Sequence, residues 1–135
     1  MDEIYDFDVA IRRHRKILAQ LRHGELALSF LDHIASFGLS KASVAKHAGH
    51  LISLLRVMDF DPATATRKDV ERIVAWINSQ PYREWTRRDK KLVLKKFIQY
   101  AKCGSCDRDT PYPPEVGWIK RRENGRDCRV KPDAP

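Results

Sequence analysis

The stretch that decides the fold is residues 87–102, which read RRDKKLVLKKFIQYAK. Phe97, Ile98 and Ala101 follow Leu94 by three, four and seven residues, the spacing of one face of an α-helix. Lysines and arginines lie among these residues and flank them on both sides. The stretch therefore predicts a helix that packs one apolar face on a small core and carries positive charge elsewhere.

A four-residue pattern typical of helix N-termini overlaps the start of this stretch, and it occurs once more twenty residues earlier. Thr66-Arg67-Lys68-Asp69 and Thr86-Arg87-Arg88-Asp89 each place a threonine hydroxyl three residues before a carboxylate. In a capping box the hydroxyl accepts a hydrogen bond from the backbone of the acidic residue, whose carboxylate accepts one from the backbone of the threonine. We therefore expect one helix to begin directly after Thr66 and another directly after Thr86, with Asp89 engaged at the second cap.

Helical periodicity also covers most of the remaining chain, and no stretch alternates apolar and polar residues as a half-buried strand would. We expect further helices over about 7–22, 25–37, 40–58 and 67–79, and a short one that starts at the prolines 113–114. Gly38 is suited to end the second of these, and Ser40 to cap the third. The predicted fold class is all-α, a small orthogonal bundle of four to five helices with an extra N-terminal helix and a basic C-terminal linker. We assign residues 1–23 to the basic N-terminal helix, 24–120 to the bundle and 121–135 to the linker.

Composition limits the partners. The chain has 135 residues, the size of one domain, and a formal net charge of +8. Residues 81–135 hold 15 Lys and Arg against 8 Asp and Glu, a net charge of +7. A basic half on a folded domain favours a polyanionic partner, although the same charge could serve solubility alone. There is no apolar run near membrane-spanning length and no signal-peptide pattern, and three cysteines argue against a disulfide framework; we expect no membrane contact and a cytoplasmic location.

Two groups of residues are candidates for phosphate contact. On the helix at 87–102, the residues Arg88, Lys91, Lys95 and Lys102 project as one row away from Leu94, and no acidic neighbour at helical spacing neutralises that row. On the helix at 40–58, one face combines small side chains, which permit close approach, with cations that suit phosphates. A plain solvent-exposed face would show the same pattern. The residues of this second group are Lys41, Ser43, Lys46, Gly49, His50 and Ser53.

Metal binding and catalysis find little support in the sequence. Cys103 and Cys106 have zinc-ligand spacing, but Cys128 is the only other cysteine and no histidine follows His50. Nucleophile elbows, phosphate-binding glycine loops and the HExxH pattern are missing. His14 and His47 lie on apolar stripes and are expected to be packed core histidines. We predict no metal, no cofactor and no catalytic residue.

The order of several short motifs adds a resemblance over residues 24–120. The motifs are Phe30-Leu31 with Ile34, then Gly38-Leu39-Ser40 with Ser43-Val44 and Leu51, then Thr66 with Asp69-Val70, then Trp85-Thr86 with Asp89, then Leu94-Lys95-Lys96-Phe97, and last Tyr112-Pro113-Pro114-Glu115-Val116 with Trp118-Ile119-Lys120. This succession resembles the N-terminal core-binding, or SAM-like, domain of phage-type integrases, which are tyrosine recombinases, and it is most similar to archaeal-type members. The cysteine pair and the basic first helix depart from the pattern, and the role of residues 1–23 stays unassigned.

The resemblance implies a function for the bundle. In that family the domain forms half of a clamp around duplex DNA, and other recombinase protomers share the DNA. The other half of the clamp is a catalytic domain, which would follow Pro135 and would carry the arginine-rich site and the tyrosine nucleophile, so this chain is not expected to be an enzyme. A stand-alone helical DNA-binding regulator and a SAM-like protein-interaction module remain alternatives. By resemblance the third and fifth helices face the DNA, which assigns DNA contact to Lys41, Ser43, Lys46, His50, Arg87, Arg88, Lys91, Lys95 and Lys102.

Overall fold

A computed structural model describes residues 6–120, which form six α-helices and one short 3₁₀ helix and contain no strand. The all-α prediction is confirmed. The predicted linker at 121–135, with Cys128, lies outside the described residues. In chain order the elements are α1 (Phe7–Leu18), α2 (Gly24–Ala35), α3 (Lys41–Val57), η1 (Pro62–Thr64), α4 (Arg67–Ser79), α5 (Glu84–Cys103) and α6 (Pro114–Gly117).

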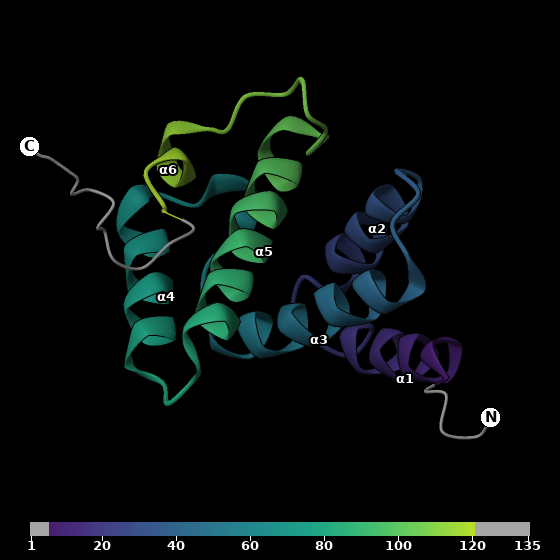
Figure 1. Cartoon of the computed structure of the whole chain (residues 1–135). Helices are drawn as coiled ribbons and strands as arrows, with labels where there is room; N and C mark the ends of the chain where they lie inside the picture. Colours follow the sequence, from purple (N-terminus) through teal and green to yellow (C-terminus); the bar gives the residue numbers. More distant parts are fainter. Residues whose placement is uncertain (1–5, 121–135) are drawn as a thin grey trace, which may run out of the picture.

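Helix α5 runs through the middle of the bundle (Figure 1). α4 and α6 lie on one side of it, and α2 and α3 lie on the other, with α1 packed against α3. The core follows the predicted apolar faces: Phe97 of α5 meets Phe30 of α2 edge to face, with ring centroids 5.6 Å apart. Because helices surround α5, more than one of its faces is buried.

Most of the predicted helix boundaries are confirmed where a side chain caps the helix. α4 spans the predicted range, and both bonds of its capping box form: the Asp69 N–H donates to the Thr66 hydroxyl at 3.1 Å, and the Thr66 N–H donates to the Asp69 carboxylate at 3.0 Å. Ser40 caps α3 by accepting from the Ser43 N–H at 3.1 Å. Gly38, with φ of +85°, takes the expected left-handed conformation, but α2 already ends at Ala35, with Ser36 as its C-cap.

The second capping box, at Thr86, was predicted wrongly. α5 begins at Glu84, Arg83 is its N-cap, and no side chain bonds to that cap. The Arg87 N–H already donates to the Arg83 carbonyl at 3.1 Å, so Thr86 lies inside the first turn instead of in front of it. The Asp89 N–H, which the capping box would have satisfied, therefore lies inside the helix, where the carbonyl four residues earlier is its partner.

The junction of α1 and α2 also differs from the prediction. The His23-Gly24 break is present, but α1 ends at Leu18 rather than near residue 22. His23 takes a left-handed conformation with φ of +62°, and Gly24 becomes the first residue of α2. A Cβ atom on Gly24 would lie 1.9 Å from the Leu18 carbonyl oxygen, so the two helix ends can pass this close only with glycine there.

Candidate nucleic-acid interface

The predicted cationic row on α5 does not form an open surface. Lys91 and Lys95 are buried, with only 6% and 8% of their surface exposed. The Lys95 ammonium donates to the Ile119 carbonyl at 3.1 Å and lies 4.3 Å from the centre of the Tyr112 ring. The interpretation of Lys95 as a surface cation was wrong: its head group is engaged by the segment that follows α5.

That segment, residues 104–119, covers the flank of α5 to which the row projects. The Gln99 amide donates to the carbonyls of Thr110 and Pro111, at 2.8 and 3.2 Å. Val116 and Ile119 of this segment are buried in the core. Lys95 and Gln99 thus fasten the segment to α5, since each satisfies carbonyl groups that no helix partner serves.

Lys90 connects α5 to α3 on the opposite flank. It is 5% exposed, and its ammonium donates to His50 Nδ1 at 3.1 Å and to the Ser53 hydroxyl at 3.0 Å. Burial lowers the pKa of this lysine. His50, which the sequence assigned to DNA contact, is instead the acceptor for Lys90 inside the helix interface.

The other α5 candidates are only partly accessible. The Arg87 guanidinium donates to the Gln80 carbonyl at 3.3 Å, and the Lys102 ammonium donates to the Ala63 carbonyl at 3.4 Å. Arg88 is half-buried and lines a surface depression at the first turn of α5. Of the five α5 residues assigned to DNA, Arg88 is therefore the one whose surroundings best suit an external ligand.

The cations of α3 are exposed and form surface ion pairs. The Lys41 ammonium lies 3.0 Å from the Asp8 carboxylate, and the Lys46 ammonium lies 3.4 Å from the carboxylate of Asp89. Both lysine side chains are more than 60% exposed, so each pair contributes at most about 1 kcal/mol and could exchange its carboxylate for a phosphate. Asp89 thus serves Lys46 and not the predicted helix cap. Ser43 takes part in the α3 cap through its N–H.

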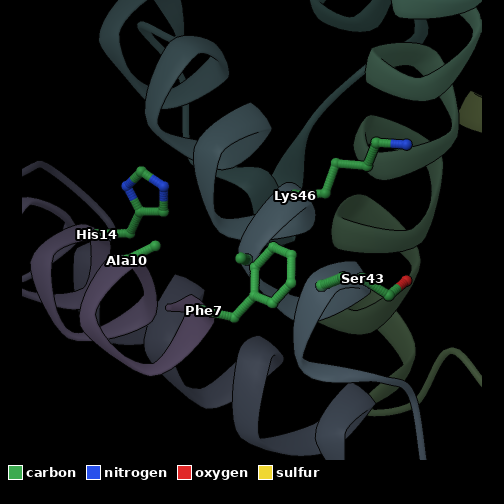
Figure 2. Close-up of a pocket in the computed structure, with 7 residues that line it drawn as sticks. Phe7, Ala10, His14, Ser43 and Lys46 are labelled. Atoms are coloured by element: carbon green, nitrogen blue, oxygen red, sulfur yellow. The ribbon is translucent and has the colours of Figure 1, made fainter. Parts of the chain in front are cut away.

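The small residues of α3 serve a contact within the chain. α1 lies against them, and a depression of about 530 Å³ at the junction is lined by Phe7 and Ala10 of α1 and by Ala42 and Ala45 of α3. Figure 2 shows Lys46 extending from α3 away from α1 and toward α5. Of the small residues that the sequence singled out on α3, Ser43 lines this depression and Gly49 faces His14 of α1. Ser53 instead accepts from Lys90 of α5.

One lysine that the sequence did not single out acts on the same histidine as Lys46. Lys96 of α5 is near enough to His47 of α3 to lower its pKa, and Lys46 acts on the same imidazole. Lys96 forms no ion pair with any residue of 6–120. We call the surface around Lys46, His47, Asp89 and Lys96 the α3–α5 face. A projection of α5 could have found Lys96, because it lies two residues beyond Leu94 and therefore nearly opposite the core.

The histidines of this region are uncharged near neutral pH. Burial is the main cause of the lowered pKa of His47, and burial followed by the charge of Lys90 lowers the pKa of His50 to about 4. The His47 Nδ1–H donates to the Ser43 carbonyl at 2.8 Å. Positive charge on the α3–α5 face therefore comes from Lys46 and Lys96.

The cysteine pair lies at the end of α5. Cys103 and Cys106 are free thiols, burial raises the pKa of Cys106, and its backbone N–H donates to His33 Nε2 at 3.1 Å. Within residues 6–120, no three His, Cys, Asp or Glu side chains are grouped so that they could hold a metal ion. The described residues thus offer no zinc site around this pair.

The comparisons with known proteins do not assign a family. No protein-family model matches the chain, and neither curated proteins nor solved structures provide a match. None of the helices in the described part of the chain has the length and apolar composition needed to cross a bilayer. The class that the fold defines is a small all-α bundle, and the integrase resemblance stays a prediction from the sequence.

Proposed function

We propose that the chain binds duplex DNA through the α3–α5 face, chiefly by contacts between lysine ammonium groups and phosphates. The observation that carries the proposal is that Lys46 of α3 and Lys96 of α5, fifty residues apart in sequence, both lower the pKa of the His47 imidazole, on a chain of net charge +8. Phosphate contacts of this kind provide affinity without reading the base sequence. Lys41 and Arg88 are further contacts that the proposal includes.

The partner chemistry follows from the charges. Within residues 6–120, Asp89 is the only acidic side chain that pairs with a lysine of this face or shifts the pKa of its histidine, and its pair with Lys46 is exposed and weak. Lys96 follows Asp89 by seven residues and therefore lies on the same side of α5 two turns further along, where it could contact a neighbouring phosphate. Counterions released from the DNA would add to the affinity and make it depend strongly on salt.

A salt titration tests this proposal. The full chain is added to fluorescein-labelled duplex DNA, and anisotropy is measured at rising salt. We expect a dissociation constant on the order of 10⁻⁴ to 10⁻⁶ M near physiological salt, with log K falling linearly as log salt rises. Binding that does not respond to salt would contradict the electrostatic proposal. A complete lack of binding would favour the protein-interaction module instead.

We further propose, from the sequence resemblance, that this contact serves a site-specific tyrosine recombinase as one half of its DNA clamp. Cleavage through a tyrosine needs cations around the scissile phosphate, and the resemblance assigns those to a separate catalytic domain. The chain incubated with supercoiled plasmid should therefore leave it supercoiled. Relaxed plasmid, or a covalent adduct between protein and DNA, would contradict the assignment of cleavage to a separate catalytic domain.

A further inference from the structure

The first turn of α5 has an exposed indole, that of Trp85, which duplex binding through the α3–α5 face does not use. Trp85 is 65% exposed, more than any other large apolar side chain in residues 6–120. Beside it is a depression of about 400 Å³ lined by Arg83, Glu84, Trp85 and Arg88. A single exposed aromatic residue is common on protein surfaces, so the feature to explain is the indole together with its charged neighbours.

The position of Trp85 follows from the geometry of α5. It precedes Leu94 by nine residues, which at 100° per residue places it on the side of the helix opposite to that core residue. The buried side of α5 holds Leu94, Phe97 and Ile98. The indole therefore cannot be covered by the core of the bundle, and it faces outward with the depression beside it.

The charges of the depression suit an anion that carries a flat ring. Arg83 and Arg88 provide two guanidinium groups and Glu84 one carboxylate, and none of the three forms an ion pair within the described residues. The lining therefore has a net positive charge. Guanidinium groups bind phosphate oxygens with planar, paired N–H donors, and an indole offers its face to a nucleobase.

We propose that this depression binds one unpaired nucleotide of a DNA strand. Its base stacks on the Trp85 indole, and the flanking phosphates lie on Arg83 and Arg88. Bases in an intact duplex are already stacked on their neighbours and cannot reach the indole, so the site distinguishes DNA with an extruded or unpaired base from fully paired DNA. The inference rests on the proposed function, because it assumes that the chain binds DNA.

The experiment compares two labelled duplexes that differ only by a single-thymine bulge. By fluorescence anisotropy the full chain should bind the bulged duplex roughly ten-fold more tightly, since stacking on an aromatic side chain typically provides this order of preference. Trp85→Ala should remove the preference and leave binding to the paired duplex unchanged. Trp85→Phe should keep part of it, because the phenyl ring still stacks.

The matched control is Phe37→Ala, which removes another exposed aromatic side chain, located at the end of α2 and outside the depression. It should keep the full preference. Circular dichroism confirms that each variant folds. As a second readout, the bulged duplex should quench part of the tryptophan emission, and Trp85→Phe, which retains Trp76 and Trp118, should abolish that quenching.

The outcomes separate the inference from the proposed function. Salt-dependent binding with equal affinity for both duplexes would overturn the inference and leave duplex binding in place. A preference for the bulge that persists in Trp85→Ala would also overturn it, because the base would then be recognised elsewhere. If neither duplex binds, the proposed function fails, and the inference fails with it.

Discussion

α4 and α5 each have the pattern Thr-Arg-Lys/Arg-Asp near their N-terminus, but only in α4 does it cap the helix. α4 lies at the edge of the bundle, where the Thr66 capping box decides where the helix starts. α5 crosses the middle of the bundle, begins at Glu84, two residues before Thr86, and has no side-chain cap. The comparison teaches that local signals govern a helix with one buried face. For a helix with several neighbours, packing decides both its boundaries and the accessibility of its charges.

The largest change in stability is expected where a charged side chain is buried on α5. Lys95→Ala should lower the free energy of unfolding by about 2 kcal/mol, because the buried Ile119 carbonyl loses a charged hydrogen-bond donor. Lys96→Ala, one position further on, removes the same charge from the partly exposed side and should cost under about 0.5 kcal/mol. Urea denaturation measures both. Equal losses would show that α5 has no distinct buried flank.

The two threonines provide the next test of the same comparison. Thr66→Ala should destabilise the chain by about 1 kcal/mol, because it removes a realised cap. Thr86→Ala should change stability by under about 0.5 kcal/mol, since Thr86 lies within the first turn and caps nothing. Thermal and urea unfolding of the two variants measure these changes in stability. A larger loss at Thr86 would mean that the second capping box forms after all.

A smaller effect concerns the interface between α3 and α5. In the unfolded chain His50 has a pKa near 6.5, whereas in the folded protein it is lowered to about 4. Between these values the unfolded state binds more protons, so stability falls as the pH drops from about 6.5 to 4. His50→Asn offers an amide oxygen to Lys90 without titrating. Urea midpoints across this range should fall less steeply in the variant.

His47 and His14 also have lowered pKa values and act in the same direction, so the variant should reduce the pH dependence without abolishing it. An unchanged slope would show that His50 does not contribute. A steeper slope in His50→Asn would contradict the assigned direction of the shift.

Much of the fold could be predicted because the signals are local. The Ser40 cap, the left-handed conformation of Gly38 and the range of α4 depend on residues within one or two turns, and all three are confirmed. The buried faces of α2 and α3 follow from helical spacing alone. The short helix at Pro114 was likewise predictable, since proline is favoured in the first turn of a helix.

The candidate site was less predictable, and the reason is geometric. A projection with Leu94 toward the core assumes a single buried side, but residues 104–119 fold back over the flank that holds Lys91 and Lys95. The spacing of residues within α5 cannot predict that residues 104–119 fold back over it. Lys96 was not predicted as a phosphate contact, because it is adjacent in sequence to Lys95, which was assigned to the cationic row. The integrase resemblance is a sequence pattern that the structure leaves untested.

The most direct test of DNA binding by the α3–α5 face compares two double variants by anisotropy across a salt series. Lys46→Ala with Lys96→Ala should weaken duplex binding and lower the slope of log K against log salt by roughly two, one unit for each lost phosphate contact. Arg12→Ala with Arg13→Ala removes the same charge from exposed positions on α1 and should reduce affinity much less. An equal or larger loss from the α1 pair would contradict the account.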